Sequence, residues 1–160
     1  MSFRATSHLF LWAVSWGGIG YYSYVASPIA FKSLDRDSFS LLQAKVFPQF
    51  FLTQSIAPIL LGVTAPYALT TGSLVTLALG SIGGLGNALW LGPKTKDIKA
   101  QRKLLESQGE TESEQYKQLT KDFGKWHGIS LLFNLLYVGS LTVYGVILSR
   151  NLIRVPVIPK

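Results

Sequence analysis

The chain has 160 residues, which is the usual size of one domain, and carries 15 lysines and arginines against eight acidic residues, for a net charge of +7. It contains no cysteine, which excludes disulfides, thiolate metal sites and cysteine nucleophiles. Only 14% of the residues are charged and 48% are apolar, with the charges crowded into a few segments, as is typical of an integral membrane protein.

The first uncharged run extends from Leu9 to Phe31 and is long enough to cross a hydrocarbon core as a helix. A single basic residue, Arg4, precedes the run, and Pro28 directly follows the small residues at which a signal peptidase could cleave. We therefore expect an uncleaved first span over residues 9–31.

The second uncharged run extends from Val46 to Pro93, about twice the length that one span needs, so it must turn back once. The polar, glycine-containing segment 68–73 is suited to that turn. The sequence predicts spans two and three over 48–69 and 73–91, and a fourth over 126–149. The whole chain, 1–160, is then a single four-span transmembrane domain.

Four spans place both termini on one side of the membrane. The terminal side holds four basic residues, and the two opposite loops hold the other eleven. By the positive-inside rule those loops face the cytoplasm and the termini face the lumen or exterior. The endoplasmic reticulum or another endomembrane is the expected compartment, with the mitochondrial and plasma membranes as alternatives. The terminal basic residues are Arg4, Arg150, Arg154 and Lys160.

The charged segment between the first two spans, FKSLDRDSFSLLQAKVFPQFF, indicates a short helix lying along the membrane interface. Asp35 or Asp37 can cap it. Pro48 suits the first turn of the following helix, because that turn does not use its missing N–H group. The apolar residues that share one face at helical spacing are Phe39, Leu42 and Val46.

The long loop, residues 94–125, alternates basic and acidic residues and breaks at Ser107-Gln108-Gly109. After the break, Thr111 and Glu114 have the spacing of a capping box, and apolar residues then recur at helical spacing into the fourth span. These features predict a cytoplasmic helical hairpin that extends spans three and four. The predicted fold class is an all-α, integral membrane four-helix bundle with this hairpin and the interfacial helix.

Small residues four apart occur on two predicted spans and let helix backbones approach closely where lipid removes the hydrophobic driving force. They are Gly80 with Gly84, and Gly124 with Gly128. Packing within one bundle is favoured over a dimer interface.

Amide side chains also fall inside predicted spans, at Gln54, Asn87 and Asn134. An unsatisfied amide is costly in hydrocarbon, so these side chains are expected to bond across helices, with a polar pathway as the alternative. The spans hold no Asp, Glu, Lys or Arg, which argues against an ion-coupled pump.

His127 lies beside Trp126 at the predicted cytoplasmic entrance of span four. A metal site would need further ligands, and the other histidine, His8, is predicted at the opposite face. We therefore expect an interfacial histidine and no metal site. The motifs of serine hydrolases, zinc proteases, P-loops and dinucleotide sites are absent, so no catalytic residue, enzymatic activity or cofactor is expected.

Three segments together resemble the transmembrane protein 205 family: FKSLDRDSFSLLQAKVFPQFF, NALWLGPKTK and DFGKWHGISLLFNL. The resemblance covers the chain from Phe31 to about Leu136. It implies a four-helix membrane protein of the endomembrane system or cell surface, associated in animals with resistance to platinum drugs and with metal handling. No catalytic residue is established for that family. The chain departs from a soft-metal role, because it has no cysteine and only the initiator methionine.

The matched polar and aromatic positions fall in the predicted cytoplasmic half of the bundle. They are expected to form one network that locks the interfacial segment to spans three and four. The alternative is a site for an anionic lipid head group or small solute, held by Lys45 and His127. The positions are Gln43, Lys45, Asn87, Trp90, Thr95, His127, Ser130 and Asn134.

The leading hypothesis is a non-enzymatic scaffold or accessory subunit that presents the 94–125 hairpin to protein partners. The alternatives are a small transporter or metal- or drug-handling protein, with a route through Gln54, Asn87 and Asn134, and a lipid-binding protein. The expected surroundings are the lipid bilayer, with anionic head groups near the basic loops and no nucleic acid.

Overall fold

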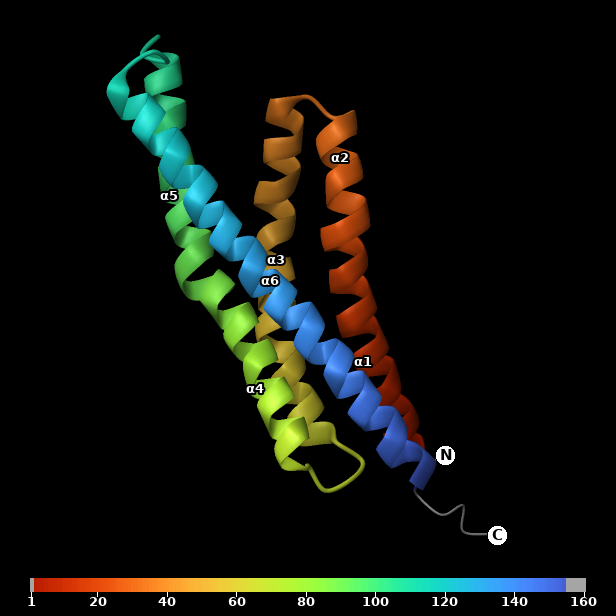
Figure 1. The fold of residues 1–160 in the computed structure, drawn as a ribbon. Helices are drawn as coiled ribbons and strands as arrows, with labels where there is room; N and C mark the ends of the chain where they lie inside the picture. The colour runs from red at the N-terminus through yellow and green to blue at the C-terminus, as the bar shows by residue number, and fades with distance from the viewer. Residues whose placement is uncertain (1, 155–160) are drawn as a thin grey trace.

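The computed structural model describes residues 2–154, which form four continuous helical stretches and no strand (Figure 1). Two short π-helical turns, η1 and η2, interrupt the first and third stretches without ending them. In chain order the elements are α1 (Phe3–Tyr21), η1 (Tyr22–Ala26), α2 (Ser27–Ser33), α3 (Arg36–Thr64), α4 (Thr71–Gly86), η2 (Asn87–Leu91), α5 (Gly92–Ser107) and α6 (Glu114–Arg154).

The stretches run up and down beside one another. Figure 1 shows the start of α1, the α3–α4 connection and the end of α6 at one end of the molecule. The α2–α3 turn and the α5–α6 connection lie at the other end, where the α5–α6 hairpin diverges from α2 and α3. The predicted helical hairpin is therefore present as a continuation of α4 and α6.

Three helical stretches in the described part are long and apolar enough to cross a membrane: Arg36–Thr64, Thr71–Ser107 and Glu114–Ile153. This confirms the prediction of membrane-type helices at these places. The first stretch, residues 3–33, is not among the three and carries Arg4 and His8 in its first turns. The four-span arrangement thus stays a prediction.

The segment between the first two stretches differs from the expected interfacial helix. Asp35 Oδ1 caps α3 by accepting hydrogen bonds from the backbone N–H groups of Asp37 and Ser38, and the bonds from Ser38 lower the pKa of Asp35. From this cap α3 continues through Pro48 to Thr64, so the segment forms the first turns of a long helix. Pro48 removes only one backbone bond, and a long helix tolerates that loss.

The hairpin turn is built by local capping. Gly109 has φ of 76°, which favours glycine, and the N–H of Glu110 reaches back to the carbonyl of Leu105 at 2.9 Å, as in a Schellman motif. Ser113 caps α6, because its Oγ accepts from the N–H of Tyr116 at 3.1 Å. The cap therefore lies two residues beyond Thr111, where the capping-box spacing had predicted it.

The core is centred on one stripe of α6. Tyr137, Leu141, Tyr144 and Leu148 are each fully buried and recur at spacings of four, three and four residues. They pack with residues of the other three stretches, including Ile19, Leu61 and Leu77. Consequently α6 is the helix around which the other stretches are arranged.

The backbones of α4 and α3 approach each other closely. Pro58 has no N–H to give to the carbonyl of Gln54, and a Cβ placed on Gly84 would lie 2.4 Å from that carbonyl carbon and oxygen. Gly80 faces Pro58 itself, and a Cβ placed on Gly80 would lie 3.3 Å from Pro58 Cγ. Only glycine at 84 lets the two backbones meet at this distance.

The second predicted glycine pair behaves differently. A Cβ on Gly124 or Gly128 would meet nothing within 4 Å. Contrary to the expectation from spacing, this pair does not pack against another helix of residues 2–154, because it lies on the outward face of α6.

Replacing Gly84 by alanine is expected to lower the free energy of unfolding by about 2 kcal/mol, because the added methyl group overpacks the α3–α4 contact. The matched control is Gly128→Ala, which makes the same chemical change in open space and should shift stability by less than about 1 kcal/mol. The measurement is the unfolding midpoint of each purified protein in one detergent. Equal midpoints for the two variants would contradict the proposed close packing.

Candidate functional site

Asn134 of α6 joins three helical stretches. Its Nδ2 donates to Ser23 Oγ in η1 at 2.8 Å, and its Oδ1 accepts from Nε2 of Gln54 in α3. Gln54 is fully buried and Asn134 is 7% exposed. The Ser23 hydroxyl itself donates to the carbonyl of Ile19, so its oxygen is left to accept from Asn134. We call Asn134, Gln54 and Ser23 the amide chain.

Asn87, in η2, forms a second contact with α6. Its Oδ1 accepts from the Ser130 hydroxyl at 2.7 Å, and its Nδ2 donates to the Ser130 carbonyl at 3.2 Å. The residue is fully buried. One serine therefore satisfies both ends of the buried amide, and the third helical stretch is held to α6 at the level of its π-helical turn.

Gln43 forms a third group, between α3 and the first stretch. Its Oε1 accepts from the Tyr22 hydroxyl at 2.9 Å, and its Nε2 donates to Ser27 Oγ at 3.1 Å. Gln43 is 5% exposed although it lies in the segment expected to rest on the membrane surface. Its burial follows from the continuity of α3, which brings this segment alongside the first stretch.

The other four predicted positions do not join these groups. Lys45 is exposed on α3, because it lies two residues after the buried Gln43 and therefore points to a different face of the helix. Thr95 donates to the carbonyls of Leu91 and Gly92 in its own turn. His127 is exposed and stacks on Phe123 with ring centroids 5.5 Å apart. Trp90 packs on Trp126 and Phe133. The expected single network is thus divided into separate contacts.

Two buried polar atoms in the centre of the molecule lack a hydrogen-bond partner among residues 2–154. They are Gln54 Oε1 and the Tyr137 hydroxyl. Both residues are fully buried, and Tyr137 lies one turn after Asn134 on α6. Unpaired buried polar groups are costly, so these two atoms mark where the interior is least satisfied.

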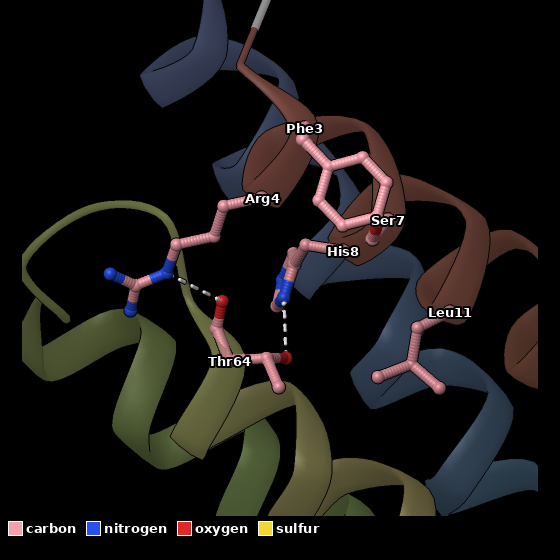
Figure 2. A pocket seen from close by; sticks show the side chains of 6 residues that line it. All are labelled: Phe3, Arg4, Ser7, His8, Leu11 and Thr64. Atoms are coloured by element: carbon pink, nitrogen blue, oxygen red, sulfur yellow. Dashed lines mark hydrogen bonds between the residues drawn. The ribbon is translucent and has the colours of Figure 1, made fainter.

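His8 forms a polar cluster at the opposite end of the molecule, and Figure 2 shows its contact with Thr64. His8 is 1% exposed; its Nδ1 lies 2.9 Å from Thr64 Oγ1 and its Nε2 lies 2.9 Å from the Tyr144 hydroxyl. Thr64 uses its own hydrogen on the carbonyl of Leu60. Nδ1 therefore donates to Thr64, and in the neutral imidazole Nε2 accepts from Tyr144.

Arg4 completes this end of the structure. Its Nη2 donates to the carbonyl of Ala65 at 2.6 Å and its Nε to the carbonyl of Thr64 at 3.4 Å, which satisfies the last carbonyls of α3. A pocket opens between these groups, seen in Figure 2 and lined by Phe3, Arg4, Ser7, His8, Leu11 and Thr64.

The sequence did not reveal the His8 contacts, because its partners lie 56 and 136 residues away. A usable signal was the spacing of His8, Ser15 and Ile19, which puts the histidine on one face of a helix with an apolar residue. No group of three or more His, Cys, Asp or Glu residues that could hold a metal occurs in the described range.

The amide chain predicts energetic coupling between Gln54 and Asn134. Asn134→Leu is expected to cost about 1–2 kcal/mol, because it leaves Gln54 Nε2 buried without an acceptor. In a double-mutant cycle with Gln54→Leu, the double variant should lose less stability than the sum of the single losses. The control is Gln49→Leu, which changes an exposed amide on α3, the helix of Gln54. Additive losses in the cycle would show that the two amides do not interact.

The comparison with known proteins gives one family. Residues 10–104, which are more than half of the chain, match the family described as Domain of unknown function (DUF4149). The match begins just after His8 and ends within α5. It does not single out the transmembrane protein 205 family, and no solved structure matches the chain. The matched length shows that the chain belongs to the DUF4149 family.

Proposed function

We propose that the chain is a four-span integral membrane protein that acts as a non-catalytic scaffold or accessory subunit and presents its α5–α6 hairpin, residues 94–125, to a partner protein. The single observation that carries this proposal is how the polar groups are used. The interior amides bond mainly between helices of the same chain, whereas the charged groups are concentrated on the hairpin.

The first stretch is proposed as the fourth span because it is packed along α6. Trp12 Nε1 donates to the carbonyl of Leu141, and Trp16 Nε1 donates to Thr142 Oγ1, both at 2.8 Å. Gly145 makes room for the Trp12 ring, which would lie 2.2 Å from a Cβ there. A stretch that follows a membrane-type helix so closely, with Phe10 and Val14 exposed on its other side, is suited to the same hydrocarbon layer.

The hairpin is held in a defined position near its tip, where α5 ends and α6 begins. Glu106 Oε1, on α5, accepts from Arg36 Nη2 at 3.0 Å and from the Tyr116 hydroxyl at 2.7 Å. Arg36 belongs to the start of α3, so this carboxylate connects the hairpin to the α2–α3 turn. Arg102 lies over the ring of Tyr116, with its Cζ 5.2 Å from the centroid, and joins the two arms. A surface held in this way is suited to recognition, because little order has to be created on binding.

Charge is separated along the hairpin. Residues 94–103 and 117–125, next to the spans, contain eight basic and two acidic residues. The tip, residues 104–116, contains four acidic and no basic residues. The inner part is thus suited to an anionic membrane surface, and the tip to a partner with a basic surface.

The hairpin end is proposed to face the cytoplasm, because eleven of the 15 basic residues lie there. Of the four basic residues on the other side, Lys160 and the side chain of Arg154 lie outside the described residues. The endomembrane compartment, and any link to platinum drugs or metals, rest on the resemblance to the transmembrane protein 205 family alone.

Glycosylation mapping tests this orientation. An N-glycosylation acceptor added ahead of Ser2 should be modified when the protein enters endoplasmic reticulum membranes, and one inserted after Gly109 should not, because only the terminal side is expected to reach the lumen. The readout is a mass shift removed by a glycosidase. Modification only at the acceptor inserted after Gly109 would show that the orientation is the opposite of the one proposed.

Partner capture tests the scaffold function. Purification of the tagged protein from its native membranes in mild detergent should retain a stoichiometric partner protein. The tip variant E110Q/E112Q/E114Q should retain about tenfold less, because it loses three of the tip's four acidic charges. Arg150→Gln, an exposed charge change at the other end of α6, should leave capture unchanged. Recovery of the protein alone would contradict the scaffold function.

A second candidate is a small transporter, favoured by Gln54 Oε1 and the Tyr137 hydroxyl, which are buried and have no hydrogen-bond partner among residues 2–154. Such a route would use Gln54, Asn134 and, one helix away, Asn87. The transporter requires that Asn134→Leu abolishes solute flux in vesicles while the protein stays folded, despite the stability loss of about 1–2 kcal/mol expected for this variant. A scaffold is expected to show no solute flux in the wild type, and Asn134→Leu should then change only its stability.

A further inference from the structure

We propose that the head group of an anionic phospholipid binds between α5 and α6 at a cluster formed by Lys94, Lys125, Trp90 and Trp126, which we call the lysine–indole cluster. The site goes beyond a scaffold function and rests only on the proposed membrane insertion. It also differs from the lipid site expected from the sequence, which would be held by Lys45 on α3 and His127 on α6.

The fold brings the cluster together from two helical stretches. The Nζ of Lys94, in the first turn of α5, lies 5.9 Å from the ring centroid of Trp126, and the Nζ of Lys125, on α6, lies 5.4 Å from the same centroid. Trp90 meets Trp126 edge to face, with centroids 5.6 Å apart. Two ammonium groups are thus held around one indole, which each contacts by a cation–π interaction.

These two cations have no carboxylate partner in the described part of the chain. The ion pairs there involve Arg36, Arg102 and Lys117, and their acids are Glu106 and Glu114. The nearest acidic residues in sequence, Asp97 and Asp122, accept from glutamines of their own helices. Two positive charges beside one indole, without a carboxylate partner in residues 2–154, favour binding of an external anion.

The depth of the cluster identifies the source of that anion. Lys94 is the first charged residue after the uncharged run 46–93, and Lys125 is the last before the uncharged run 126–149. The cluster therefore lies where the apolar part of each helix ends, which is the level of lipid phosphates and of interfacial tryptophans. Basic pockets between membrane helices at this level are suited to anionic head groups.

The surface just inside the cluster suits an acyl chain. Trp90 is 52% exposed and packs on Phe133 with ring centroids 6.4 Å apart. Phe133 is itself seated in the space left by Gly86, where a Cβ would lie 2.2 Å from its ring. A ligand with an anion directly next to hydrocarbon matches both parts of the site, whereas a soluble acidic peptide matches only the lysines.

The test compares two variants that remove the same charge. K94Q/K125Q changes the cluster, and K103Q/K121Q changes two exposed lysines farther along the same two helices. Native mass spectrometry of the full chain, titrated with phosphatidylserine or phosphatidylcholine in detergent, gives the affinity for each lipid. Wild type should prefer phosphatidylserine. The cluster variant should bind it about 30-fold more weakly, since each lysine near the surface contributes about fivefold, and the control variant less than about threefold.

Equal weakening in both variants would overturn the site, because it would show only the general attraction of a basic hairpin. No preference for phosphatidylserine in the wild type would also overturn it, as would full competition by inorganic phosphate. Carbonate extraction of the same membranes separates this failure from that of the proposed function. Release of the wild-type protein would overturn membrane insertion and the site together, whereas retention with equal affinities would overturn the site alone.

Discussion

The structure depends on the requirement that a polar group inside a membrane protein finds its partner within the protein. Asn134 meets it for three helical stretches at once, by donating to Ser23 and accepting from Gln54. Because the amide stands on the same stripe of α6 as Tyr137 and Tyr144, its bonds fix the rotation of α6 relative to its neighbours. Removal of the amide would leave Gln54 Nε2 as a buried donor that lipid cannot satisfy.

Close packing adds what the hydrogen bonds cannot supply. Lipid removes most of the hydrophobic drive between helices, so contact area must come from backbones that approach closely. Pro58 and Gly84 create such an approach between α3 and α4, and Gly145 of α6 makes room for the side-chain ring of Trp12 of α1. Proline and glycine, which weaken isolated helices, therefore stabilise this assembly through shape.

The two ends of the molecule use their polar residues for different purposes. At the terminal end, Arg4 and His8 are occupied with the last turn of α3 and with Tyr144, which makes that end a closing contact of the bundle. At the hairpin end, Lys94 and Lys125 gather around an indole without acidic partners in the described residues, and the tip is acidic. That end has charge available for a membrane surface and a partner, which is why we place recognition there.

The sequence by itself determined the local features of this protein. Uncharged runs predicted helices of membrane type, Asp35 was identified as a possible cap, and the break at Gly109 predicted a helical hairpin, because each depends on neighbouring residues. The sequence did not determine that Pro48 lies inside a helix or that Ser113, not Thr111, caps α6. The tertiary structure alone decided that the predicted polar network divides into pairs, that Gly124 and Gly128 face outward, and that His8 meets Tyr144. These outcomes depend on the rotation and spacing of helices far apart in the chain, which local residue patterns do not encode.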